Sequence, residues 1–210
     1  MAPRQADLFD VPEPSGLRLT EAFLDTAEES AAIASIDSDD LLPFQFQGWI
    51  GNRRTISYGW RYDFENGGFR PAAAMPAWLV PLRDRAEAFA GLAPGTLVQA
   101  LLIHYPPGAG IGWHRDRPVF EQVVGISLGA PATLRLRRRT GPRAFDRAEQ
   151  HLPPRSVYLL SGQARHGWEH SIAPMAEPRW SITFRALSAL GLRQTRNGPE
   201  GSPPPGRVAG

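Results

Sequence analysis

A stretch near the C-terminus, Arg179-Trp180-Ser181-Ile182-Thr183-Phe184-Arg185, decides the fold class of this chain because polar and apolar residues alternate along it. Such alternation is typical of a β-strand whose two faces meet different surroundings. Other short strand-like runs precede it, with Gly and Pro residues between them. The full set is Thr96–Tyr105, Val123–Leu128, Thr133–Arg138, Ser156–Leu160, His170–Ile172 and Arg179–Leu187. Short strands without helices between them predict an antiparallel sandwich or barrel.

Two helices are predicted before these strands. Apolar residues recur near helical spacing from Thr20 to Ile36, and Thr20 is a suitable N-cap. A second helix is predicted to begin at Pro76, since proline suits the first helical position, and to end at Gly91. The predicted fold class is therefore mostly β with N-terminal helices (α+β), in which a helical layer supports a β-core.

Composition limits the classes of function. The 210 residues predict one domain with appendages, and the lack of cysteine excludes disulfides, thiolate metal sites and a cysteine nucleophile. Residues 1–16 are predicted to be a flexible acidic N-terminus and residues 191–210 a disordered tail. No apolar run is long enough for a membrane span, and the first residues lack an apolar signal segment. We therefore expect a cytoplasmic protein without a membrane partner.

Charge is distributed unevenly along the chain. Residues 1–50 carry two arginines and ten acidic residues, whereas residues 51–150 carry fourteen arginines and eight acidic residues. A basic body of this kind fits an anionic partner such as nucleic acid. All basic residues are Arg and none is Lys, which codon composition also explains. The arginine count alone therefore identifies no partner.

Two histidines and one aspartate form a candidate metal site. The tripeptide His114-Arg115-Asp116 puts an imidazole and a carboxylate on one face of an extended segment, and His170 lies far downstream. Two His and one carboxylate are the facial triad that leaves positions open on Fe(II). A chance His-x-Asp on a surface and a structural His170 are the alternative interpretation.

The predicted strand at Arg179–Leu187 carries a second candidate site. Arg179, Ser181, Thr183 and Arg185 share one face of it. Two arginines on the core side require a partner anion, and the guanidinium fork suits a short dicarboxylate. In the alternative interpretation this face is solvated and the aromatic face lies in the core.

Four motifs together resemble a known family. They are Tyr105-Pro106-Pro107-Gly108-Ala109-Gly110-Ile111-Gly112-Trp113-His114-Arg115-Asp116, Gly125-Ile126-Ser127-Leu128-Gly129, Trp168-Glu169-His170-Ser171-Ile172 and the Arg179/Arg185 pair. In this order they resemble the AlkB family of Fe(II)- and 2-oxoglutarate-dependent dioxygenases, whose fold is a double-stranded β-helix (jelly roll). The resemblance implies one such domain over residues 17–190, with a jelly-roll core at about 95–187 and an N-terminal substrate-recognition lid at about 44–70.

The resemblance also implies a role for each motif. The catalytic residues His114, Asp116 and His170 would bind Fe(II), with His166 as a rival third ligand. The binding site for 2-oxoglutarate would consist of Tyr105, Arg179, Ser181 and Arg185. With O₂ as the other co-substrate, such an enzyme oxidatively dealkylates N-alkylated bases in DNA or RNA and releases formaldehyde, succinate and CO₂. We expect a monomer that acts on nucleic acid.

The segment between Asn52 and Phe64 mixes aromatic residues with arginines, as contact with a flipped base and its phosphates requires. The candidate substrate-binding residues are Arg53, Arg54, Tyr58, Arg61, Tyr62 and Phe64. An aromatic cluster that anchors a loop to the core is the alternative. Downstream, Arg135, Arg137 and Arg139 alternate with other residues to form a basic stripe, which fits either phosphate binding or a charged edge strand.

Two departures from the family pattern leave the substrate open. Arg117 and Pro118 stand where many members have an acid that recognises the base, and Glu121 could replace it. Ile103 stands where Asn often contacts the co-substrate. The same oxidative chemistry on a protein or small molecule, a zinc hydrolase with Glu169 as base, and a non-catalytic nucleic-acid-binding module therefore stay open as alternatives.

Overall fold

The structure, a computed structural model, describes residues 14–46, 49–62 and 69–196. Its N-terminal half contains β1 (Leu17–Thr20), α1 (Thr26–Asp37), β2 (Leu42–Phe46), β3 (Trp49–Tyr58), β4 (Trp60–Tyr62), β5 (Phe69–Pro71), the 3₁₀ turn η1 (Ala77–Leu79) and α2 (Val80–Ala90). Its C-terminal half contains β6 (Leu97–Tyr105), β7 (Ile111–His114), β8 (Phe120–Gly129), β9 (Ala132–Arg139), β10 (Phe145–Leu152), β11 (Val157–Leu160), α3 (Gly162–His166), β12 (Glu169–Ile172), β13 (Arg179–Leu187) and α4 (Ala189–Arg196). No helix in these ranges is long and apolar enough to cross a membrane.

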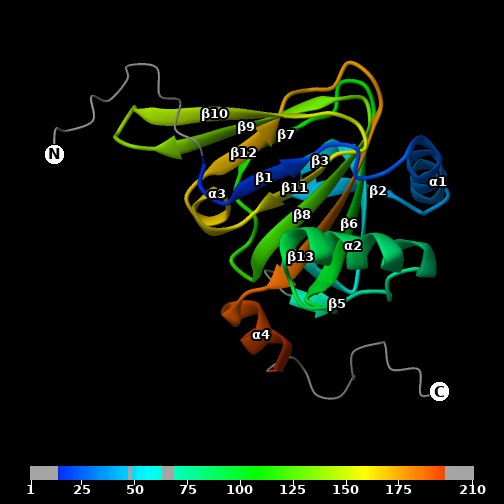
Figure 1. Cartoon of the computed structure of the whole chain (residues 1–210). Helices are drawn as coiled ribbons and strands as arrows, with labels where there is room; N and C mark the ends of the chain where they lie inside the picture. Colours follow the sequence, from blue (N-terminus) through cyan, green and yellow to red (C-terminus); the bar gives the residue numbers. More distant parts are fainter. Residues whose placement is uncertain (1–13, 47–48, 63–68, 197–210) are drawn as a thin grey trace, which may run out of the picture.

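Two antiparallel sheets form the body of the molecule (Figure 1). The major sheet has the strand order β1-β11-β8-β13-β6-β3-β2, and the minor sheet has the order β10-β9-β12-β7. Apolar side chains from both sheets pack between them, among them Ile103, Leu134, Leu136 and Leu160. The predicted mostly β fold with N-terminal helices is confirmed.

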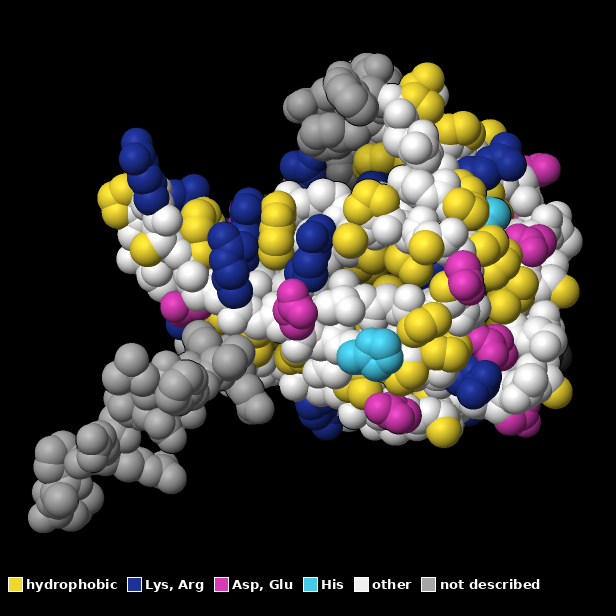
Figure 2. All heavy atoms as spheres, turned by 90° about the horizontal axis from the view of Figure 1, so that it is seen from above, with side chains coloured by type: hydrophobic (Ala, Val, Ile, Leu, Met, Phe, Trp, Pro, Cys, Tyr) yellow, Lys and Arg dark blue, Asp and Glu magenta, His cyan; other side chains and the backbone are white. Residues whose placement is uncertain are grey.

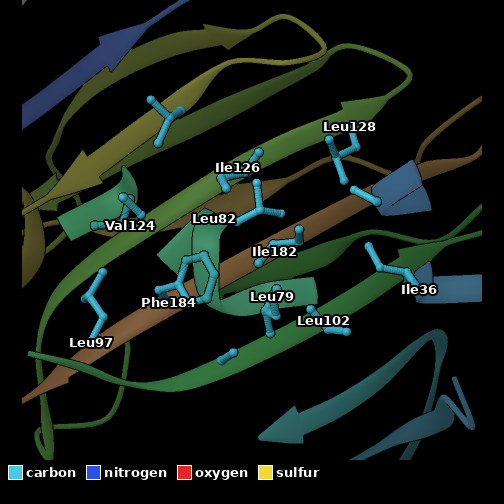
Figure 3. Packing of buried hydrophobic residues seen from close by; sticks show 14 of the residues in the cluster. Ile36, Leu79, Leu82, Leu97, Leu102, Val124, Ile126, Leu128, Ile182 and Phe184 are labelled. Carbon is cyan, nitrogen blue, oxygen red and sulfur yellow. The ribbon is translucent and has the colours of Figure 1, made fainter. Parts of the chain in front are cut away.

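A second core lies on the other face of the major sheet, under the helices. Figure 3 shows Leu79 and Leu82 of the η1–α2 segment over Leu102, Ile182 and Phe184 of the central strands. β13 is consequently buried on both faces. Its apolar residues face the helices, and its arginines face the space between the sheets, where Arg179 is completely buried. The alternative of a solvated arginine face is therefore wrong.

The first helix begins later than the sequence predicts. Asp25 caps α1 by accepting a hydrogen bond from Glu28 N, and the Glu28 side chain accepts one from Asp25 N. Thr20, the predicted cap, instead ends β1 opposite Val157 of β11. The prediction of a helix from Thr20 fails because β1 is held by a partner far along the chain, which local periodicity cannot reveal.

The segment after β13 contains a correction to the predicted disordered tail. Residues 191–196 belong to α4, and residues 197–210 lie outside the described ranges, as do residues 1–13. Ser188 N donates to Val119 O and Ser188 Oγ donates to Pro118 O. Gly191 lies so close to Val119 that a Cβ on it would collide with the Val119 carbonyl oxygen. The start of α4 is thus fastened to the loop that follows Asp116.

We expect Phe184→Ala to reduce the free energy of unfolding by about 3–5 kcal/mol, because it empties a fully buried position under α2. Urea unfolding measures this loss. The matched control is Leu192→Ala on α4, which is 48% exposed and should change stability by less than about 0.5 kcal/mol. Equal effects of the two substitutions would contradict the packing described above.

Candidate active site

The candidate active site is a cavity of about 1150 Å³ between the two sheets. It is lined by all the residues that the sequence assigned to the metal and to 2-oxoglutarate, and by part of the predicted lid. These lining residues are Tyr105, His114, Asp116, His170, Arg179, Ser181 and Arg185, with Arg53, Arg61 and Tyr62 from the lid.

Sheet register brings the two candidate histidine ligands together. His114 at the end of β7 lies directly opposite His170 of β12, and their ring centroids are 4.2 Å apart. Asp116 follows β7 by two residues, and its Oδ2 lies 3.6 Å from His170 Nε2. His114 Nδ1 donates to the Gly112 carbonyl at 2.8 Å, which leaves Nε2 as the free nitrogen.

The charge states of these groups suit a divalent cation. Burial lowers the pKa of His170 to about 3 and also lowers the pKa of His114, so both imidazoles are neutral near pH 7 and keep a lone pair. Burial raises the pKa of Asp116, but Arg185 and the two histidines outweigh it and hold that pKa below its usual range. Two neutral imidazoles and one carboxylate are the donors of a facial iron triad.

In the described geometry these donors contact one another and do not surround a common point at ligand distances. A bound metal would therefore take the place of the contact between His170 and Asp116. Asp116 Oδ1 accepts a hydrogen bond from Arg185 Nε at 2.7 Å, so Oδ2 is the oxygen left for a metal. The donor types of this set fit Fe(II).

Arg179 is the strongest indication of an anionic ligand. Its side chain is fully buried, its guanidinium lies 5.1 Å from the Tyr105 ring centroid, and Nη2 donates to Ser127 Oγ at 3.3 Å. Its Nε and Nη1 have no hydrogen-bond acceptor among the described residues. A buried cation with unsatisfied donors costs several kcal/mol unless an anion pairs with it. A carboxylate in the cavity fits this requirement.

Arg185, in contrast, already has partners. Besides Asp116, it donates through Nη1 to Gln99 Oε1 at 2.9 Å, and Gln99 lies directly opposite it on β6. In the described geometry Arg185 thus contacts the candidate metal ligand Asp116, and since it also lines the cavity its contact with 2-oxoglutarate stays a prediction. Sequence analysis missed Gln99. Its signal is a single amide in the otherwise apolar run Leu97-Val98-Gln99-Ala100-Leu101, where a buried polar group needs a partner.

The predicted lid residues divide according to strand alternation. Arg53 faces the cavity with its guanidinium 3.7 Å from the Phe44 ring centroid, and burial lowers its pKa. Arg54 is exposed and Tyr58 is buried in the core under the helices, where burial and Asp39 raise its pKa to about 12. Neither lines the cavity, so neither is placed to contact a base inside it, and contact of the exposed Arg54 with a backbone phosphate stays a prediction. The last of the six candidates, Phe64, lies outside the described residues.

Three other sequence alternatives fail on geometry. His166 Nε2 pairs with Glu121 Oε1 at 2.8 Å, and neither residue lines the cavity. His166 is therefore not placed to be the third ligand, nor is Glu121 placed to recognise a base. Glu169 pairs with Arg137 at 2.6 Å and does not line the cavity, which removes the base of the proposed zinc hydrolase.

Two departures from the family pattern do lie in the cavity wall. Ile103 is buried there, and the Arg117 guanidinium lies 4.8 Å from the Tyr62 ring centroid. An arginine with a stacked ring thus stands where the family pattern leads us to expect an acid.

We expect Arg179→Met to leave the free energy of unfolding unchanged or to raise it when no ligand is present, because an unsatisfied buried charge is removed. Asp116→Ala is the contrasting variant, since it leaves buried Arg185 without its carboxylate and should cost about 3 kcal/mol. Urea unfolding of both variants without 2-oxoglutarate tests this. A loss for Arg179→Met as large as that for Asp116→Ala would show that Arg179 has a partner.

Known proteins of similar sequence and fold indicate the family of this chain. The profile of the 2OG-Fe(II) oxygenase superfamily matches residues 42–195. The "Alkylated DNA repair protein ALKBH8 homolog" of Arabidopsis thaliana is 28% identical over 182 residues, which cover 75% of this chain and 50% of the relative. The "tRNA (carboxymethyluridine(34)-5-O)-methyltransferase alkbh8" of Xenopus tropicalis is 28% identical over 166 residues, which cover 77% of this chain and 26% of the relative. The chain thus spans half or less of the length of these relatives.

Solved structures show the same fold. "The structure of OsALKBH1" matches with a TM-score of 0.65 at 15% identity, over 83% of this chain and 98% of the other. A Pseudomonas putida prolyl-4-hydroxylase matches with a TM-score of 0.57 at 17% identity, over 82% of this chain and 93% of the other. The relatives named above are AlkB homologues. Since the superfamily match spans most of the chain, the chain belongs to the 2OG-Fe(II) oxygenase superfamily, as a dioxygenase that uses Fe(II), 2-oxoglutarate and O₂.

Proposed function

We propose that this dioxygenase removes N-alkyl groups from bases in DNA or RNA, and that His114, Asp116 and His170 hold its iron. The observation that carries the proposal is one cavity that combines this donor set, the unsatisfied Arg179 guanidinium and an entrance lined by arginines and aromatic rings. We assign the catalytic domain to residues 17–190, the core to about 95–187 and the lid to about 44–70, which contains β3, β4 and most of β2 and β5.

The chain's own residues would prepare the iron site. The free Nε2 of His114 and the unprotonated His170 ring offer nitrogen donors, and Asp116 offers Oδ2. Arg185 donates from Nη1 to Gln99 Oε1 and from Nε to Asp116 Oδ1, and these two hydrogen bonds hold the carboxylate in one orientation. When bound, Fe(II) with 2-oxoglutarate and O₂ supplies the oxidation of a C–H bond and releases succinate and CO₂.

Arg179 would bind a carboxylate of 2-oxoglutarate. Its Nε and Nη1 have no acceptor among the described residues and its side chain lines the cavity, so a carboxylate there would supply the acceptor that this guanidinium lacks. Tyr105 lies against the guanidinium and Ser181 lines the same wall. The low exposure of this end keeps water away from the reacting groups.

The other end of the cavity supports a nucleic-acid substrate. An enzyme that oxidises a base must take it out of its stack and hold it against flat groups. Tyr62 with Arg117 and Phe44 with Arg53 offer such surfaces, and Arg61 adds a positive charge for a phosphate. A hydroxymethyl group formed on a base nitrogen leaves as formaldehyde. The names of two relatives, one of DNA repair and one of tRNA modification, fit the same class of substrate.

The proposal is tested by anaerobic reconstitution with Fe(II) and 2-oxoglutarate, followed by air and an N-methylated DNA or RNA oligonucleotide. We expect mass spectrometry to record the loss of a methyl group together with succinate and formaldehyde. His114→Ala should abolish this turnover, whereas His151→Ala, an exposed position on β10, should not alter it. Turnover of methylated peptides or small molecules, with none of oligonucleotides, would refute the proposed substrate class.

Binding of 2-oxoglutarate tests the role of Arg179 separately. We expect Arg179→Met to weaken binding about 100-fold, because about 3 kcal/mol of charge-assisted hydrogen bonding is lost. Calorimetric titration of the metal-loaded protein measures this change. The control Arg83→Met removes an arginine that pairs with Asp84 on α2 and should bind like the unmodified protein. If both variants bind equally well, another residue holds the carboxylate.

A further inference from the structure

The outer face of the minor sheet carries a basic surface outside the catalytic cavity. The β9–β10 hairpin, residues 132–152, contains six arginines and only two acidic residues. Figure 1 shows it projecting beyond the sheets, and Figure 2 shows dark blue side chains among yellow ones along this projection. We call this outer face the basic arm. It consists of Arg135, Arg137 and Arg139 from β9 and of Phe145 and Arg147 from β10.

Strand register brings like charges together on the basic arm. Arg137 and Arg147 lie directly opposite each other, an arrangement that is destabilising for two residues of the same charge. Three guanidiniums surround one ring. The carbons CZ of Arg137, Arg139 and Arg147 lie 5.0, 4.8 and 5.8 Å from the Phe145 ring centroid.

Nearby acids neutralise this surface only in part, although Glu149 of β10 lies opposite Arg135 of β9. Glu169 pairs with Arg137 at 2.6 Å, but neither Arg139 nor Arg147 forms an ion pair within the described part of the chain. Arg139 donates instead to the Pro142 carbonyl at 2.9 Å. The side chains of Arg139 and Arg147 are both exposed. An anion that bound here would offset the repulsion between the arginines.

The basic arm is continuous with the mouth of the cavity. Trp113 precedes His114 on β7 and lines the cavity, and the guanidiniums of Arg135 and Arg137 lie 5.4 and 4.4 Å from its ring centroid. From β7 across β12 and β9 to β10 there are three strand spacings, or roughly 14 Å. This length accommodates several successive phosphates of an extended strand.

We propose that the basic arm binds the phosphate backbone of the nucleic-acid strand whose target nucleotide enters the cavity. This inference rests on the proposed function and extends it to a second contact surface. Guanidinium edges bind phosphate oxygens, and the rings of Trp113 and Phe145 between them suit bases, which stack on aromatic faces. An acidic peptide would use the charges but not the rings. A charged edge strand needs no such ring-centred cluster to prevent aggregation.

The test compares two double variants that each remove two positive charges. Arg139→Gln/Arg147→Gln alters the basic arm. Arg18→Gln/Arg83→Gln alters arginines beside α2, where Arg18 donates to Phe89 O, on the opposite side of the major sheet. The probe is an unmodified single-stranded 12-nucleotide DNA, measured by fluorescence anisotropy between 50 and 300 mM NaCl, with polyglutamate as a second probe.

We expect the arm variant to bind DNA about tenfold more weakly at low salt. The slope of log K against log salt concentration should fall by about 1.4, since each single-strand phosphate contact contributes about 0.7. The Arg18/Arg83 variant should keep the Kd and slope of the unmodified protein. Urea unfolding checks the fold, which the arm variant should retain because it removes the repulsion between Arg137 and Arg147.

Each other outcome overturns a defined part of the argument. If the unmodified protein binds DNA tightly and the arm variant has the same Kd and slope, the basic arm does not bind the phosphate backbone, and the proposed function is not affected. Absence of DNA binding by the unmodified protein would refute the nucleic-acid substrate and the arm together. Polyglutamate binding that matches DNA in strength and is lost in the same variant would replace the nucleic acid with an acidic protein partner.

Discussion

The burial of β13 on both faces is the constraint on which the rest of this molecule depends. One face packs under α1 and α2 through Ile182 and Phe184, and the other lines the cavity with Arg179, Ser181 and Arg185. Because residues alternate along β13, this one strand contributes both to the hydrophobic core under the helices and to the candidate active site. Because β6 and β8 pair with β13 on either side, the partners Gln99 and Ser127 reach those arginines from neighbouring strands.

The minor sheet serves two purposes through a single register. The pairing of β12 with β7 sets His170 opposite His114, and the pairing of β12 with β9 sets Glu169 opposite Arg137. Successive residues of β12 point to opposite faces, so the inner face holds the proposed metal site and the outer face begins the basic arm. A change of register by one residue would exchange the two faces and destroy both surfaces at once.

Residues that belong to local sequence patterns could be predicted as candidates from the sequence. Strands and contacts that depend on pairing with a distant segment could not. His114, Asp116, His170 and Arg179, which line one cavity, could be selected as candidates because each lies in a short motif or on an alternating strand. β1 and β10 were missed because Leu17–Thr20 and Phe145–Leu152 are strands only through pairing with β11 and β9. The positions of Arg54 and Tyr58 outside the cavity were not predicted, since no local pattern told which face of β3 meets the cavity. Gln99 became meaningful only when Arg185 lay opposite it.

The fastening of α4 has a consequence for shortened forms of the protein. Ser188 and Gly191 hold the Pro118–Val119 turn, although 70 residues separate Ser188 from Pro118. That turn directly follows the segment that carries Asp116. A premature stop just after β13 would leave every cavity-lining side chain in the protein. It would remove the contacts of Ser188 and Gly191 with the turn that follows Asp116. Such a truncation would therefore impair the enzyme although no cavity residue is lost.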